Sequence, residues 1–412
     1  MRAEIKNRIE QIRQGKVPAG YKKTKQGISP AEWTGMSVKD CLCRVEKPVQ
    51  VEPETLYTQI GIRSHGNGIF YKEPVTGREL KNKSVFWIEP DCFILNIVFA
   101  WEQAVGRTTK AEKGMIGSHR FPMYRPIEDR VDIDYLVYYF LTPRGTNILE
   151  EASPGGAGRN RTLGQERFLK STILLPPIEE QQEIAKILMT QDRVIALREK
   201  LLAEKLRQKQ YLMQVLLTGK KRLPGFSEKW KLVHLKDLCA YVRRRSVNSF
   251  DTYVNNENIS SNLKGTVHFG EERNEVAGME YRKGDILIGN IRPYLKKIWL
   301  ADRDGICSPD ILVLRPSNIS SSCMYNLIAT DTFFSYMMTG AGGSKMPRGD
   351  KKQVMEYPLQ VPQSVKEQDE ISHIFSLINE EIELLEQVLI QERWKKKALM
   401  QLLLSGIVRV KP

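Results

Sequence analysis

The chain has 412 residues, of which 41% are hydrophobic, 27% charged and 8% aromatic, and this globular composition excludes a disordered or collagen-like chain. Lysine and arginine (63) exceed aspartate and glutamate (49) by 14, so a polyanion such as nucleic acid is the first expected partner. The longest apolar stretch, 93–101, is too short to cross a membrane, and the charged N-terminus lacks the apolar core of a signal peptide. We therefore expect a cytoplasmic protein whose cysteines are reduced.

Residues 1–20 are expected to form an N-terminal helical segment that joins the helical region described below. The sequence from Gly15 to Tyr21 resembles the sequence from Gly219 to Phe226, which follows a predicted long helix. Residues 1–14 therefore look like the end of another long helix.

Two globular modules are expected at 21–175 and 223–361, because parts of the first return in the second. Trp33 and the Val38-Lys39-Asp40 that follows it return from Trp230 onward at an offset of 197, and Ser118 to Pro126 return as Ser308 to Pro316 at an offset of 190. The drifting offset indicates loops of different length on a shared scaffold. Short apolar runs inside the modules, such as 286–288 and 311–314, are typical of strands, so each module is predicted to mix helices and strands.

Each module is followed by a region that is predicted to be one long helix, a central one at 176–222 and a C-terminal one at 362–412. Residues 180–188 return as 367–375 and residues 212–219 return as 399–406, both at an offset of 187, so a rigid element without insertions lies between the matched ends. Apolar residues alternate spacings of four and three, which is the seam of a coiled coil. The expected seam residues are Ile184, Leu188, Ile195, Leu202, Ile371, Phe375, Ile378, Ile382, Leu385 and Leu389.

The predicted fold is therefore mixed α/β. Two globular domains are separated by two long antiparallel helices that form a coiled coil, and the whole is a pseudo-two-fold internal repeat. A forty-residue helix extends about 60 Å.

The positive excess is shared by both modules and lies in loop-like contexts, where binding residues tend to be found. Arginine and lysine bind phosphates and guanine, so DNA contacts are expected there. A single one of these residues is more often a solvated surface charge, and the inference rests on the group. The candidates are Arg63, His65, Asn67, Lys81, Lys83, Arg107, Lys110, Arg120, Arg159 and Arg161 in the first module, and Arg243, Arg244, Arg245, Arg292, Lys296, Lys297, Lys345 and Arg348 in the second.

No catalytic or metal site is expected. The sequence has no Walker loop, no Asn-Pro-Pro-aromatic tetrad of an amino-methyltransferase, and no Pro-Asp followed by Glu-x-Lys of a restriction-type nuclease. The five histidines are scattered, and Cys41-x-Cys43 lacks a second pair at zinc spacing.

The stretch 175–184 matches the motif that starts the central conserved helix of a known family, and 216–219 matches its end. In the first module, 60–70 and 96–101 resemble stretches of one class of target-recognition domain. On these residues the chain resembles, over essentially its whole length, the specificity subunit (HsdS) of Type I restriction-modification enzymes. The second module matches only the looser frame of 284–288 and Arg315-Pro316, so contact residues cannot be transferred between the modules on sequence grounds.

The resemblance implies two target-recognition domains, 21–175 and 223–361, each reading one half of a gapped, asymmetric double-stranded DNA site. It implies that the helices act as a spacer and as a docking surface for two methyltransferase subunits and for ATP-dependent restriction and translocase subunits. This chain would be non-catalytic, and S-adenosylmethionine, ATP and magnesium would belong to the partner subunits. A helix of about 60 Å allows half-site centres no more than about 17 base pairs apart.

Two alternatives remain open on the sequence. A coiled-coil adaptor without intrinsic DNA specificity would account for the helices but not for the duplicated basic modules. An autonomous DNA-modifying enzyme would need a catalytic site with an unfamiliar sequence pattern.

Overall fold

The computed structural model describes residues 3–24, 27–81, 83–155, 161–248, 252–269, 276–343 and 345–410. The chain divides into two compact units: unit 1 combines Met1–Arg198 with Val388–Pro412, and unit 2 is Glu199–Gln387. Both division points fall inside long helices, whereas the boundaries drawn from the sequence lie near the helix ends. Each globular module therefore packs together with segments of both helices.

Unit 1 is built around a four-stranded antiparallel sheet in the order β11-β10-β13-β4. Its strands are β4 (Leu42–Val45), β10 (Phe93–Leu95), β11 (Val105–Arg107) and β13 (Met123–Pro126). An aromatic cluster in which the ring centroids of Phe93 and Phe140 lie 5.4 Å apart fills the core beside this sheet.

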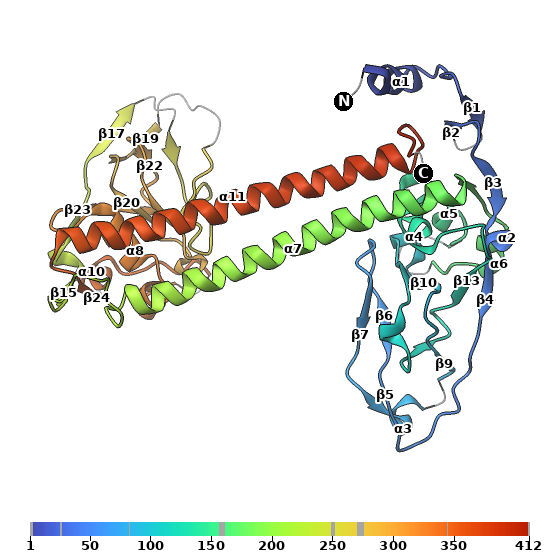
Figure 1. Cartoon of the computed structure of the whole chain (residues 1–412). Helices are drawn as coiled ribbons and strands as arrows, with labels where there is room; N and C mark the ends of the chain where they lie inside the picture. Colours follow the sequence, from blue (N-terminus) through green and yellow to red (C-terminus); the bar gives the residue numbers. More distant parts are fainter. Residues whose placement is uncertain are drawn as a thin grey trace. The chain divides into compact units, whose positions relative to one another are not determined.

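Further elements of unit 1 complete the domain (Figure 1). Its remaining strands are β1 (Tyr21–Thr24), β2 (Gly27–Pro30), β3 (Thr34–Ser37), β5 (Leu56–Tyr57), β6 (Ile60–Ile62), β7 (Ile69–Tyr71), β8 (Val75–Thr76), β9 (Val85–Trp87), β12 (Ile116–Ser118) and β14 (Thr172–Leu175). Its short helices are α1 (Ala3–Arg13), α2 (Val38–Cys41), α3 (Gly77–Leu80), α4 (Ile133–Phe140), α5 (Pro143–Glu151) and α6 (Gln165–Lys170), with the 3-10 turns η1 (Ala100–Glu102) and η2 (Lys110–Glu112).

Unit 2 repeats the four-stranded sheet in the order β21-β20-β23-β16. Its strands are β16 (Cys239–Tyr241), β20 (Ile286–Gly289), β21 (Ile298–Leu300) and β23 (Ile311–Pro316). Pro316 pairs with Cys239 as Pro126 pairs with Leu42 in unit 1, so the register is the same. The predicted internal repeat is confirmed at the level of strand order.

Further strands and short helices complete unit 2. The strands are β15 (Lys231–His234), β17 (Arg245–Asn248), β18 (Tyr253–Val254), β19 (Val276–Tyr281), β22 (Gly305–Cys307) and β24 (Pro358–Val361). The helices are α8 (Ser321–Ile328), α9 (Asp331–Thr339) and α10 (Lys351–Met355), with the 3-10 turns η3 (Leu235–Asp237) and η4 (Pro293–Leu295).

Two helices of 39 residues, α7 (Ile178–Leu216) and α11 (Val365–Leu403), lie beside one another within each unit (Figure 1). In unit 1, Gln191 Nε2 donates to Glu392 Oε2 at 2.7 Å, and in unit 2, Lys205 Nζ lies 2.8 Å from Glu381 Oε1. Residue numbers rise on one helix as they fall on the other, so the helices are antiparallel. The predicted fold of two mixed α/β domains and two long antiparallel helices is confirmed.

The expected seam residues are buried to different degrees. Ile184 and Leu188 pack into the globular core of unit 1, and Ile371 and Phe375 into that of unit 2. Ile378, Ile382 and Leu389 are also buried, whereas Ile195, Leu202 and Leu385 are half-buried. The helix ends are therefore fixed by the domains, and a seam along the whole pair stays a prediction.

A buried glutamate in the first turn of each long helix ties the helix to its domain. In unit 1, Glu180 accepts two hydrogen bonds from Arg409, at 2.7 and 2.9 Å, and one from Trp33 Nε1 at 3.3 Å. In unit 2, Glu367 accepts two from Arg222, at 2.6 and 2.7 Å, and one from Trp230 Nε1 at 3.3 Å. Each arginine follows the glycine after the opposite long helix by three residues, so the repeat closes cyclically.

The N-terminal helix α1 joins the segment after α11 within unit 1. Arg8 Nη1 donates to the carbonyl of Ile407 at 2.6 Å, and Tyr21 Oη donates to that of Gly406 at 2.6 Å. Among the residues that the structure describes, no helix is both long enough and apolar enough to cross a membrane.

Candidate nucleic-acid interface

Three predicted contact residues lie at the tip of the β6–β7 hairpin in unit 1 (Figure 1). The side chains of Arg63, His65 and Asn67 are exposed there. The Arg63 guanidinium lies 4.8 Å from the ring centroid of Phe70, which is close enough for a cation–π interaction. Asn67 Nδ2 donates to the carbonyl of Ser64 at 2.9 Å and thereby closes the turn.

Arg161 contacts the 3-10 turn η1. Its guanidinium lies 5.4 Å from the ring centroid of Trp101 in this turn, and the backbone of the hairpin tip is hydrogen-bonded to the same turn. The structure therefore brings Arg161 to the element that also holds His65. Arg159 lies outside the described residues.

The other candidates of unit 1 are spread over the domain. Lys81 and Lys83 are exposed just after α3, at the opposite end of the domain from α4 (Figure 1). Lys110 and Arg120 are exposed as well. The structure does not bring these three lysines and one arginine to the hairpin tip. The cationic candidates of the first module therefore do not form a single surface.

Arg107 is held by two carboxylates within unit 1. Its guanidinium pairs with Asp91 at 2.8 Å and also with Asp134, and Arg107 Nε is buried. Because the guanidinium is half-buried and doubly paired, it stabilises the contact between β11 and α4. A DNA contact through this side chain would have to compete with both carboxylates.

A second group of candidates surrounds η4 in unit 2. The backbone N–H of Arg292 donates to the carbonyl of Pro347 at 2.8 Å, which brings the segment with Lys345 and Arg348 beside η4. Arg292 and Lys345 are exposed. Arg348 Nη2 lies 3.0 Å from Asp310 Oδ1, so its charge is partly balanced. Arg292, Lys345 and Arg348 therefore form a cationic cluster beside η4.

Lys296 and Lys297 follow η4 and have protein partners. Lys296 forms an ion pair with Asp331, and Lys297 Nζ donates to the carbonyl of Asn256. Burial lowers the pKa of Lys297. Lys297 therefore serves the packing of the domain, and Lys296 is available only if it leaves Asp331.

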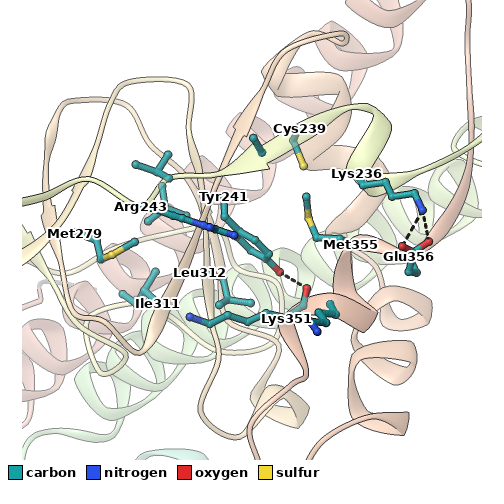
Figure 2. Close-up of a pocket in the computed structure, with 14 residues that line it drawn as sticks. Lys236, Cys239, Tyr241, Arg243, Met279, Ile311, Leu312, Lys351, Met355 and Glu356 are labelled. Carbon is teal, nitrogen blue, oxygen red and sulfur yellow. Dashed lines mark hydrogen bonds and ion pairs between the residues drawn. The ribbon is translucent and has the colours of Figure 1, made fainter.

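Arg243 and Arg244 lie between β16 and β17, and Arg245 begins β17, next to a pocket of about 690 Å³ (Figure 2). Arg243 lines this pocket together with Lys351 and Lys352, while Arg244 lies 3.2 Å from Glu280. Arg243 and Arg245 are exposed. Lys351 and Lys352 are the first two residues of α10.

Apolar residues such as Ile311, Leu312 and Val313 also line the pocket. Figure 2 shows the Tyr241 hydroxyl bonded to the carbonyl of Lys351, at 3.0 Å, and Lys236 paired with Glu356. Burial raises the pKa of the Cys239 thiol to about 12, so this sulfur is protonated at neutral pH. The pocket can hold an anionic or polar group at its cationic rim.

The remaining cysteines behave in the same way where they are buried. All six are free, and burial raises the pKa of Cys41 to about 11 and that of Cys307 and Cys323 to about 12. Within the described ranges, no group of three or more His, Cys, Asp or Glu side chains is arranged to hold a metal ion.

A family model described as the Type I restriction modification DNA specificity domain matches residues 64–205 and 227–392. The specificity subunit of Type I restriction enzyme EcoDI from Escherichia coli is 32% identical over 92 residues, which are 22% of this chain and 20% of that relative. The MjaVIII specificity subunit from Methanocaldococcus jannaschii is 22% identical over 93% of this chain and 94% of its own length.

Solved structures resemble the fold of the whole chain. The HsdS subunit from Thermoanaerobacter tengcongensis has a TM-score of 0.50 and 18% identity, and covers 95% of this chain and 98% of its own. The Type I restriction-modification S subunit from M. genitalium has a TM-score of 0.57 and 13% identity, with 90% and 96% covered. A chain from a study of complex assembly in the type I R-M system has a TM-score of 0.56 and 16% identity, with 92% and 99% covered.

Proposed function

Because the chain belongs to the family of Type I restriction modification DNA specificity domains, we propose that it directs such a complex to a gapped, asymmetric DNA sequence, each globular domain reading one half. The observation that carries the proposal is the repeated four-stranded sheet, which bears cationic loops of unlike sequence in the two units. A shared scaffold with different exposed side chains is suited to reading two different half-sites.

We further propose that this chain recognises DNA and that partner subunits perform the chemistry. Adenine methylation with S-adenosylmethionine would belong to methyltransferase subunits, and cleavage driven by ATP and magnesium would belong to restriction subunits. The cationic groups around the hairpin tip and η4 would hold the duplex through its phosphates. Their number predicts a strong dependence of binding on salt.

The two long helices offer a surface for partner helices. Large apolar side chains are exposed on both helices in both units, and Trp394 on α11 is 76% exposed. The others are Met189, Leu197, Leu201, Leu206 and Tyr211 on α7, and Val365, Leu377, Leu384 and Ile390 on α11. Exposed apolar residues along a helix are typical of helix–helix docking sites, so we propose that two methyltransferase subunits bind here.

The proposal is tested by DNA selection with the purified chain and a methyltransferase subunit, using a library of random duplexes at several salt concentrations. We expect enrichment of one bipartite motif with two unlike halves, and a steep fall of affinity with salt. A coiled-coil adaptor without DNA specificity would enrich no motif. Methylation by the purified chain alone would instead support an autonomous enzyme.

A further inference from the structure

In unit 1, the tip of the β6–β7 hairpin is fastened to the residues that end η1. The backbone N–H of His65 donates to the carbonyl of Glu102 at 2.7 Å, and that of Gly66 donates to Gln103 at 3.1 Å. His65 and Gly66 have φ of 58° and 67°, and Gln103 has φ of 60°. The tip is therefore a tight turn of two left-handed residues, bonded to a left-handed cap.

Unit 2 contains the same arrangement. The backbone N–H of Asn262 donates to the carbonyl of Leu295 at 2.9 Å, and that of Leu263 donates to Lys296 at 3.0 Å. Asn262 and Leu263 have φ of 60° and 59°, and Lys296, after η4, has φ of 51°. The antiparallel bridge between Ile259 and Val267 closes the hairpin as β6 and β7 do in unit 1.

The positions of these residues make the two arrangements copies of one another. His65 and Asn262 are 197 residues apart, as are Trp33 and Trp230 at the start of the modules. The 3-10 turns η1 and η4 are 193 residues apart, and at that offset Trp101 of η1 corresponds to Tyr294 of η4. At the offset of 197, Ser64 and Gly68 return as Ser261 and Gly265, whereas the three residues between them differ in the two tips.

The backbone conformation is costly, and both copies keep it. Left-handed φ is uncommon for residues other than glycine and is least suited to bulky side chains such as that of Leu263. Conformations of this kind persist where the surrounding structure holds them, and they are concentrated at functional sites. Here the bonds to η1 and η4 hold them, and they fix the direction of the side chains on the tip.

Each tip presents two exposed side chains at equivalent positions. The first is His65 in unit 1 and Asn262 in unit 2, and the second is Asn67 and Lys264. The residues between them are half-buried in both tips. Within the described part of the chain, the side chains of Asn262 and Lys264 have no hydrogen bond or ion pair. Their polar atoms are therefore free to bind a ligand.

We propose that these two hairpin tips are equivalent base-reading elements, one for each half of the DNA site. His65 and Asn67 would read one half-site, and Asn262 and Lys264 the other. Asparagine can bind adenine N6 and N7, and lysine binds guanine O6 and N7. Histidine has one donor and one acceptor nitrogen when neutral, so it can also bind a base edge. Because only the side chains differ, the two tips select different bases. This inference rests on the proposed function.

The test exchanges the two exposed residues between tips, in the double variants H65N/N67K and N262H/K264N. Asparagine and histidine both tolerate left-handed φ, so the exchange leaves the turn intact. Each variant, with a methyltransferase subunit, selects from a library of random DNA duplexes. We expect each to lose discrimination at base positions in one half-site only, by about tenfold to hundredfold per lost contact, while the other half-site stays unchanged.

Matched controls are K170A in unit 1 and K231A in unit 2, which remove exposed lysines outside the tips and leave the selected motif unchanged. The single variants N67A and K264A change positions without positive φ and guard against a folding effect of the exchange. An unchanged motif in both exchange variants, with the wild-type motif intact, overturns the tip assignment alone. If the wild-type chain itself selects no motif, the proposed function falls, and the tip assignment with it.

Discussion

Glu180 and Glu367 each place a negative charge in the interior at the first turn of a long helix, and each is matched by one arginine and one indole N–H. The sequence repeat singled out both glutamates, but it did not reveal their burial. Their partners, Arg409 and Arg222, could have been found, since each lies three residues beyond the repeated glycine. A carboxylate in this setting is stable only while its cation stays in place.

Replacing Arg222 by methionine is expected to lower the free energy of unfolding by about 3–5 kcal/mol, because Glu367 is left buried without its cation. Arg78→Met is the control, since the pair of Arg78 with Glu54 is exposed and such pairs contribute about 0–1 kcal/mol. Denaturant unfolding of both variants measures the difference. Equal losses in the two variants would contradict the structural role of the Arg222–Glu367 pair.

Lys209 on α7 supplies a pH-dependent prediction. Burial lowers the pKa of Lys209 in the folded chain below the ordinary 10.5, which the unfolded chain keeps. At pH values between the folded and the unfolded pKa, the unfolded chain therefore binds more protons than the folded one. The wild-type chain should therefore gain stability as pH rises through that window. Lys209→Met removes this gain and is more stable than the wild type at pH 7. Unfolding midpoints from pH 7 to 10.5 measure the effect, and parallel curves for the two proteins would refute it.

At the scale of the elements, the sequence predicted the long helices well and the hairpin tips poorly. The two repeated stretches at the helix ends and the constant offset of 187 between them place α7 and α11 near their observed ends. The strands are only two to six residues long, so their patterns could not establish the order of the sheets. Tip residues such as Asn262 were missed because their equivalence to His65 depends on backbone hydrogen bonds and not on residue identity.

Trp394→Ser is expected to weaken binding of a methyltransferase subunit at least tenfold, because a large exposed aromatic on a docking helix is a typical centre of binding energy. Lys397→Ser, at an exposed position of the same helix, should leave binding unchanged. Titration of each variant with the partner, with circular dichroism to check helicity, distinguishes the two. Unchanged affinity of the Trp394 variant would place the docking surface elsewhere.

At the scale of the whole molecule, the repeated order of module and helix predicted the architecture that the structure has. The offsets between the copies contained that information, because they change within the modules, where loops differ in length, and stay at 187 across the long helices. The bases that are read could not be predicted, because most candidate cations are scattered and several are paired with carboxylates inside their own unit. Arg107 with Asp91 and Asp134 is the clearest such case.

Helix length should set the gap between the half-sites. Insertion of seven residues after Arg198 in α7, with seven before Val388 in α11, adds about 10 Å to each helix and almost two full turns. If the helices act as the spacer, the selected motif should keep both half-sites and gain about three base pairs between them. A motif of unchanged length from a well-folded insertion variant would rule out the spacer role.

The most direct test of the central claim is a map of methylated adenines in the host genome, with and without the gene for this chain. The account predicts that deletion removes one bipartite motif with two unlike halves, and that reintroduction of the gene restores it. Loss of a continuous or perfectly palindromic motif would contradict the claim that each domain reads its own half-site. An unchanged map in a host that makes active partner subunits would contradict the specificity role itself.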